Sequence, residues 1–153
     1  MPDTIDKKTF QGAYAQRPPW DIDGPQPAFR ALRGKLSGSL LDAGCGSGEH
    51  ALYFAAQGLT VTGIDFLDQP IAQARAKAAQ RGVSATFRVK DALSLQLWPE
   101  RFDNVLDSGL FHIFSDDDRA VYVKGLATVL KPGGRLYLLC FSDRTPGKQG
   151  PRR

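Results

Sequence analysis

The chain has 153 residues, 42% of them hydrophobic and 24% charged, which is the size and composition of one globular domain with its own core. Its formal net charge of +4 comes from positive residues that alternate with acids, so we expect no nucleic-acid partner and a solvated basic tail, made of Arg144, Lys148, Arg152 and Arg153. No apolar run is long enough to span a bilayer and no signal-peptide layout opens the chain, which indicates a cytoplasmic domain without a membrane partner.

The first 38 residues are predicted to form an N-terminal lid or cap segment. Ile5, Phe10 and Tyr14 are spaced near helical periodicity, which predicts a short helix. Residues 17–27 contain four prolines and a glycine, so they form a stiff loop. This loop carries Trp20, which either closes over a ligand or fills the end of the core. Residues 28–36 then have a helical pattern that ends before Gly38.

Residues 39–141 alternate between strand and helix patterns and are predicted to form the core of a single domain that spans residues 1–153. The strands are expected from Leu40 and at 59–64, 85–89, 102–107 and 135–141. Further helices are expected at 49–57, 68–81, with Asp68 as N-cap, and 115–130, ended by the Pro-Gly-Gly at 132–134. Such alternation predicts an α/β fold, a Rossmann-like doubly wound parallel sheet of about five strands with helices on both faces. Residues 142–153 are expected to be a loose tail.

Aspartates and glycines follow the predicted strands. The carboxyl ends of parallel strands meet at one edge of the sheet, so the acids that follow these strands are expected to converge there; they are Asp42, Asp65, Asp91 and Asp107. Between the first two acids, Gly44, Gly46 and Gly48 alternate in a turn where a ligand can approach the backbone closely. The sequence therefore predicts a cofactor site at this edge.

Two cofactor classes fit this arrangement to different degrees. A dinucleotide fingerprint needs G-x-G-x-x-G and an acid about twenty residues on, which Asp65 satisfies. The glycine spacing does not fit, because Glu49 or His50 stands where the third glycine belongs. Asp42 would also receive a pyrophosphate poorly, whereas it suits a ligand that carries an ammonium group. A nicotinamide-dependent oxidoreductase is therefore a distant alternative.

Five motifs carry a resemblance to a known family. In this order and spacing the sequence resembles the class I S-adenosylmethionine-dependent methyltransferases over nearly its whole length; the motifs are 41–48 (LDAGCGSG), 61–65 (VTGID), 91–93 (DAL), 102–105 (FDNV) and 130–134 (LKPGG). Residues 19–27 and 107–114 more narrowly resemble the thiopurine methyltransferase and tellurite-resistance-like branch. Members of that branch act on small thiols, metalloids and related acceptors.

The resemblance implies a binding site for S-adenosyl-L-methionine. The methionine part would lie against the turn, on Asp42, Gly44, Cys45, Gly46 and Gly48. The ribose hydroxyls would bind Asp65, and the adenine would lie among Phe66, Asp91, Ala92 and Leu93. Trp20 and the backbone at Ser108 would complete the site. For Phe66 and Leu93, core packing is the alternative.

The resemblance also implies in-line methyl transfer to a small-molecule acceptor, a thiol, a metalloid or a hydroxyl. His112 is the candidate general base, although a histidine among apolar residues is more often a packing residue. Trp20, Phe111 and Phe114, with His112, would form an apolar acceptor pocket. No metal is expected, because two separated histidines and Cys45 have no ligand spacing, and the cysteines are predicted to be free thiols.

The family's sheet has seven strands, but no strand pattern follows Phe141. The strand at Leu136–Phe141 would then be a bare apolar edge, which proteins seldom leave uncovered. Three explanations compete: a truncated chain, which we favour, a homodimer that covers the edge with a second copy, and a tail that folds back. A truncated or non-catalytic S-adenosylmethionine-binding protein is therefore the alternative function.

Overall fold

A computed structural model describes residues 3–147, so the predictions for Lys148, Arg152 and Arg153 lie outside the described residues. Its centre is a five-stranded sheet with the order β3-β2-β1-β4-β5. The strands are β1 (Ser39–Ala43), β2 (Thr60–Asp65), β3 (Thr86–Val89), β4 (Phe102–Ser108) and β5 (Leu130–Leu139). Every pairing is parallel. The strand order reverses beside β1, which is the position where open α/β sheets bind ligands.

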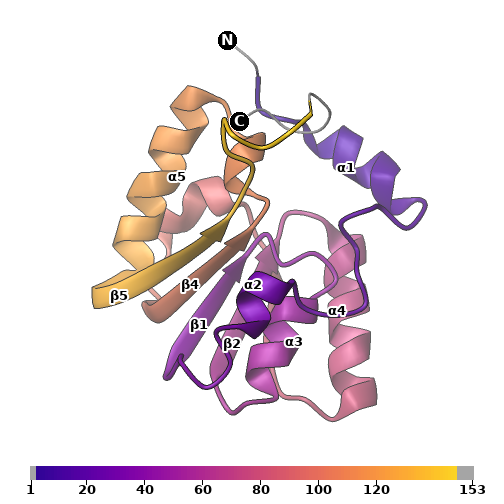
Figure 1. Cartoon of the computed structure of the whole chain (residues 1–153), viewed down its shortest axis with the longest axis vertical. Helices are drawn as coiled ribbons and strands as arrows, with labels where there is room; N and C mark the ends of the chain where they lie inside the picture. Colours follow the sequence, from indigo (N-terminus) through magenta and orange to yellow (C-terminus); the bar gives the residue numbers. More distant parts are fainter. Residues whose placement is uncertain (1–2, 148–153) are drawn as a thin grey trace.

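Helices pack on both faces of the sheet, as predicted (Figure 1). One face is covered by α3 (Glu49–Ala55), α4 (Asp68–Arg81) and the short α2 (Pro27–Arg30), around a core that contains Phe29, Phe54 and Ile71. The other face is covered by α5 (Asp116–Val129) and the 3-10 segments η1 (Ala92–Leu97) and η2 (Phe111–Ile113), around a core that contains Leu95 and Tyr122. The parallel α/β prediction is therefore confirmed.

Two predictions about helices were wrong. The helix expected at 28–36 ends as α2 at Arg30, and the following residues make tighter i→i−3 turns that lead to Gly34, whose φ is +73°. A left-handed glycine cannot continue an α-helix. Asp68 is not the N-cap of α4, because Leu67 holds that position and its N–H donates to Asp65 Oδ1 at 3.0 Å.

Strand β5 begins earlier than predicted. Leu130 leaves α5 in an extended conformation and pairs with Phe102, so the Pro-Gly-Gly at 132–134 lies within the strand instead of before it. A register shift opposite Asp103 accommodates these residues, and a Cβ on Gly134 would lie only 3.0 Å from the Asp103 carbonyl oxygen. A proline is tolerated here because the outer edge of β5 needs no N–H donor.

The predicted apolar edge is present, but the strand ends at Leu139 and not at Phe141. Within residues 3–147, β5 pairs only with β4, and Leu136 and Leu138 are 38% and 42% exposed. A second copy that covers this edge remains a prediction. Among the described residues, no helix has the length and apolar character needed to cross a membrane.

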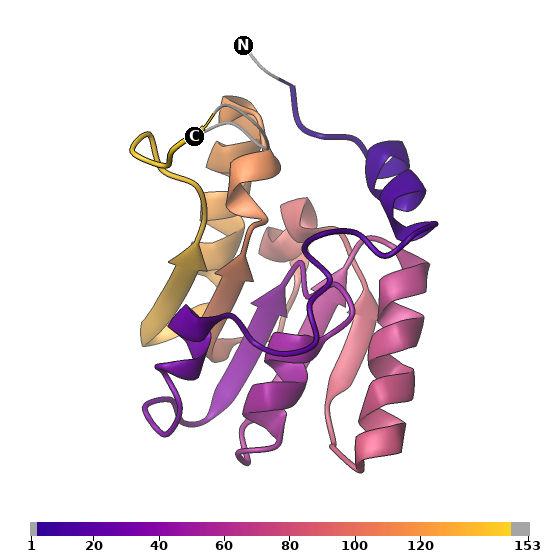
Figure 2. The same ribbon diagram turned by 45° about the vertical axis from the view of Figure 1, so that its right-hand side comes forward.

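The N-terminal segment crosses the end of the sheet to which the strands point (Figures 1 and 2). Its helix, α1 (Lys7–Tyr14), confirms the predicted N-terminal helix. Before α1, the Ile5 N–H donates to the Ile113 carbonyl at 3.0 Å. After it, Gln69 on α4 donates to the Tyr14 carbonyl at 2.7 Å. The segment therefore spans the strand ends from η2 to α4.

Candidate functional site

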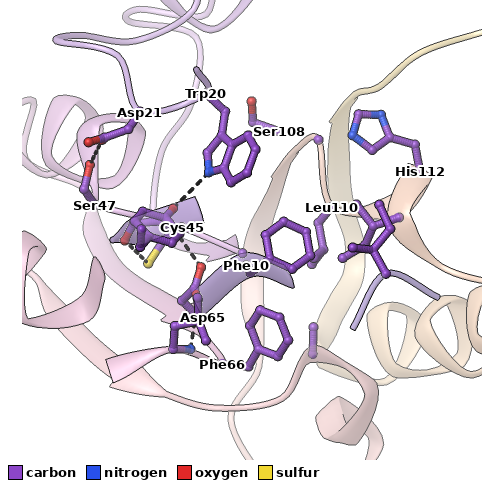
Figure 3. A pocket seen from close by; sticks show the side chains of 18 of the residues that line it. Phe10, Trp20, Asp21, Cys45, Ser47, Asp65, Phe66, Ser108, Leu110 and His112 are labelled. Atoms are coloured by element: carbon purple, nitrogen blue, oxygen red, sulfur yellow. Dashed lines mark hydrogen bonds between the residues drawn. The ribbon is translucent and has the colours of Figure 1, made fainter. Parts of the chain in front are cut away.

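A cavity of about 1100 Å³ lies at the carboxyl ends of the strands, under the N-terminal segment (Figure 3). Its wall is built by the N-terminal segment, by the turn after β1 and by the residues that follow β2, β3, β4 and β5. All the predicted site residues line it except Asp42 and Phe111. Both free cysteines, Cys45 and Cys140, also line it, as the free-thiol prediction allows.

The glycine turn depends on backbone conformations that favour glycine. Gly44, Gly46 and Gly48 have φ values of 70°, 55° and 91°. A Cβ on Gly48 would lie 2.8 Å from the Ala74 Cβ, so this glycine lets α4 pack against the turn. A Cβ on Gly46 would instead face the cavity wall, 3.1 Å from the Tyr14 hydroxyl. The turn thus keeps a backbone surface open to the cavity.

Asp65 connects the glycine turn to the end of β2. Its Oδ2 accepts from the Gly46 N–H at 3.1 Å, and its Oδ1 accepts from the Leu67 N–H at 3.0 Å. Burial raises the pKa of this carboxyl, while the backbone donors act in the opposite direction. A rigidly held carboxyl group therefore lies in the cavity wall, next to Phe66.

Asp42 lies behind the turn and is 1% exposed, so it does not reach the cavity surface. Burial and the nearby charge of Asp107 raise its pKa to about 8, against a hydrogen bond from the Ala51 backbone. Its Oδ2 has no hydrogen-bond partner among the described residues. Such an orphaned buried oxygen is rare in proteins, and it is stabilised when a cation approaches.

Asp107 has a structural task that the sequence did not reveal. Its carboxylate accepts from the Leu110 N–H at 2.8 Å, from the Phe111 N–H at 3.1 Å and from the Tyr122 hydroxyl at 2.8 Å. Burial raises its pKa to about 6. Asp107 therefore fixes the loop after β4. Of the four predicted strand-end acids, only Asp65 and Asp91 line the cavity.

The N-terminal wall contains two aromatic residues that we did not assign to the site, Phe10 and Tyr14. Trp20 Nε1 donates to the Tyr14 hydroxyl at 3.1 Å. The Phe10 ring lies edge-on to the rings of Trp20 and Phe66, with centroids 5.6 and 5.7 Å away. Trp20 is 48% exposed, so it covers the cavity instead of filling the core. The four-residue spacing of Phe10 and Tyr14 on one helix face was the available signal.

His112 lines the cavity, but both ring nitrogens have partners. Nδ1 accepts from the Phe141 N–H at 3.2 Å, and the ring is also hydrogen-bonded to the Gly109 backbone, which Nε2 faces. Burial and the charge of Arg119 lower its pKa. The imidazole therefore joins the loop after β4 to the segment after β5, and it has no free lone pair for a proton.

Phe111 lies outside the cavity wall, contrary to the prediction. Its ring packs under the Arg119 guanidinium at 4.5 Å and near the Tyr122 ring at 6.5 Å. The 3-10 conformation of η2 explains this, because its three residues point in three directions. Phe114 faces the cavity and also touches Tyr122, with ring centroids 5.1 Å apart.

His50 fixes the loop that precedes α2. Its Nε2 accepts from the Gln26 N–H at 2.9 Å, and burial lowers its pKa to about 4.

A depressed histidine pKa means that the stability that His50 supports is complete above pH 6.5 and is lost as the pH falls towards 4. We compare the free energy of unfolding of wild type with that of His50→Gln. The amount by which wild type exceeds the variant should fall by up to roughly 3 kcal/mol between pH 7.5 and pH 4, measured by urea unfolding. A constant difference across this range would contradict the assignment.

Comparison with known proteins places this architecture in a family. Residues 40–134 match the family model described as a methyltransferase domain. The chain belongs to this methyltransferase domain family. The match begins at β1 and ends inside β5, so it contains the glycine turn, Asp65 and Asp91.

Two relatives are longer than this methyltransferase domain. The 2-heptyl-1-hydroxyquinolin-4(1H)-one methyltransferase of Mycobacteroides abscessus is 37% identical over 142 residues, covering 90% of this chain and 63% of that protein. The ubiquinone biosynthesis O-methyltransferase of Xanthomonas euvesicatoria is 34% identical over 140 residues, covering 83% of this chain and 57% of that protein. The chain therefore spans about three fifths of the length of these relatives.

Solved structures agree with the fold. A chain from work on the conversion of a disulfide bond into a thioacetal group during echinomycin biosynthesis has a TM-score of 0.85 and 46% identity, over 91% of this chain and 63% of that one. TehB from Haemophilus influenzae has a TM-score of 0.68 and 18% identity, over 78% of this chain and 42% of that one. The second likeness is one of fold alone.

Proposed function

We propose that this methyltransferase domain binds S-adenosyl-L-methionine and transfers its methyl group to a small-molecule acceptor. One observation carries the proposal: the open glycine turn, the fixed carboxyl of Asp65 and the exposed Asp91 all line a single cavity. Membership of the methyltransferase domain family supports it. Relatives named as methyltransferases support it as well.

The residues present fit the cofactor. The unpartnered oxygen of Asp42 lies behind the turn, where its negative charge would favour the ammonium group of the methionine part without reaching the cavity surface, and the open backbone of the turn suits close approach. Asp65 would bind the ribose hydroxyls. Asp91 would lie at the adenine edge, with Phe66 and Leu93 against the ring faces and with Trp20 over the cofactor.

For the acceptor we propose an apolar small molecule that carries a hydroxyl or thiol group. The wall beyond the glycine turn is largely apolar, and it includes Phe10, Ile113, Phe114 and Leu139. The names of the quinolinone and ubiquinone relatives support a hydroxyl on an apolar molecule. A TehB-like fold supports the tellurite-resistance-like branch, and with it thiols or metalloids, to a smaller extent.

When bound, S-adenosylmethionine supplies an electrophilic methyl group on a sulfonium sulfur. The wall residues hold the acceptor in line and exclude water, and positioning of this kind can supply roughly 7 to 11 kcal/mol. His112 has no free lone pair, so its role is to hold the two segments of the acceptor wall together. An acceptor that ionises readily needs no enzyme base.

The two roles of His112 predict different pH profiles. For His112→Gln we expect kcat/KM to fall by roughly tenfold or less at every pH, because a loosened wall positions the acceptor less well. The decrease of kcat/KM at acidic pH should have the same midpoint in the variant as in wild type. If this decrease disappears in the variant, His112 is the general base.

A methyl-transfer assay with labelled S-adenosylmethionine tests the proposed function. We expect turnover with at least one of three acceptors: a hydroxyquinolinone, an aromatic thiol or tellurite. Binding of the cofactor with no transfer to any acceptor would favour the alternative, a cofactor-binding chain without turnover.

A further inference from the structure

A chain of polar contacts ties the loop that carries Trp20 to the glycine turn and to α4. Asp21, the next residue in this loop, accepts a hydrogen bond from Ser47 Oγ in the turn. Lys77 on α4 donates from Nζ to Ser47 Oγ and to Glu49 Oε1, both at 3.0 Å. We call Asp21, Ser47 and Lys77 the loop latch.

The loop latch is not explained by stability alone. Ser47 and Glu49 are buried, and the Lys77 side chain is only 25% exposed. Burial acts to raise the pKa of Glu49, but hydrogen bonds from Arg81 and Lys77 outweigh it and lower the pKa, so this buried carboxylate is ionised. Taking charged groups out of water costs free energy that an apolar cluster of the same size avoids. Such a buried network therefore indicates that these contacts select one conformation of the loop.

The loop latch acts where the cavity needs a fixed wall. Residues 17–27 have little regular structure, so side-chain contacts must hold this loop in place. Both Asp21 and Ser47 line the cavity, and Trp20 adjoins Asp21. Figure 3 shows the Asp21–Ser47 bond on the opposite side of the cavity from His112, with Trp20 between them.

We propose that Asp21 and Lys77 are positioning residues, which hold Trp20 over the cofactor part of the cavity through Ser47. This inference rests on the proposed function, because it concerns the same cofactor. Arg17 holds the backbone of Asp21 from outside, because its Nε donates to the Asp21 carbonyl at 2.8 Å, but it lies 3.7 Å from the carboxylate, so Lys77 supports the carboxylate side through Ser47. Glu49 keeps its contact with Arg81 when Lys77 is removed, which limits damage to the fold.

Fluorine NMR of 5-fluorotryptophan-labelled protein tests the position of Trp20 without any ligand. The chain has two tryptophans, and Trp20→Phe assigns their signals. In Lys77→Met we expect the Trp20 signal to move and sharpen, while the signal of the buried Trp98 stays in place as an internal control. Lys124→Met, an exposed lysine on α5 outside the cavity, should change neither signal.

Calorimetry with S-adenosylhomocysteine tests the consequence for the cofactor. Lys77→Met should bind about tenfold more weakly than wild type, as the loss of one charged hydrogen bond suggests, and Lys77→Arg should recover most of the affinity. An unchanged Trp20 signal or an unchanged affinity in Lys77→Met overturns the inference. If wild type itself does not bind, the proposed function fails, while the fluorine signals still decide whether the latch holds Trp20.

Discussion

Replacing Asp65 by alanine is expected to lower the affinity for S-adenosylhomocysteine roughly 100-fold, because two hydroxyl hydrogen bonds to a charged group are lost. The same change leaves the N–H groups of Gly46 and Leu67 without their acceptor. We therefore also expect the free energy of unfolding to fall by about 1 to 3 kcal/mol. Calorimetry measures the affinity, and urea unfolding measures the stability.

Asp68→Ala is the matched control for this prediction. Asp68 is exposed, makes no capping hydrogen bond in the first turn of α4 and lies three residues beyond Asp65. It should keep the wild-type affinity. If Asp65→Ala binds as tightly as Asp68→Ala, the ribose contact has been assigned to the wrong residue.

Asp42→Asn is expected to make the free protein more stable and the cofactor complex weaker. The pKa of Asp42 is raised to about 8, above the value near 3.9 of an unfolded aspartate, so the folded chain holds this proton more tightly. The stability that Asp42 contributes is therefore complete at low pH and is lost as the pH rises through 8. Removing the acid should add about 5 kcal/mol at pH 8 and little at pH 4, measured by urea unfolding.

The affinity of Asp42→Asn for S-adenosylhomocysteine should fall about tenfold, because the ammonium group loses a charge partner. A substitution that stabilises a protein and weakens its ligand indicates a site kept for function. Asp117→Asn, at an exposed position on α5, should alter neither quantity. Equal affinity of Asp42→Asn and wild type would mean that the buried carboxyl has no part in binding.

The sheet and the position of the cavity could be predicted because several local signals agreed. Apolar β-branched runs, glycines after helices and acids after strands all indicated the same alternation. The prediction of the glycine turn was accurate for the same reason, because the backbone has a positive φ at residues 44, 46 and 48, which few residues other than glycine adopt. The early start of β5 could not be predicted, because a Pro-Gly-Gly sequence normally ends a helix and only pairing with β4 makes it a strand.

The finer features of the site depend on contacts between distant segments. Asp42, Asp65 and Asp107 have similar places in the sequence pattern and are all buried, but only the tertiary structure shows that Asp65 lines the cavity and the other two do not. Phe10 and Tyr14 line the cavity because the N-terminal segment crosses the strand ends. Their helical spacing places them on one helix face but does not predict this crossing. The partners of His112, Gly109 and Phe141, likewise come from two different strand ends.

Titration calorimetry of the wild-type chain with S-adenosylmethionine, S-adenosylhomocysteine and NAD tests the central assignment most directly. Asp42 behind the glycine turn suits an ammonium group and receives a pyrophosphate poorly. We expect heat of binding with both adenosyl ligands and none with NAD. Binding of NAD alone, or of none of the three, would contradict the assignment of the cavity to S-adenosylmethionine.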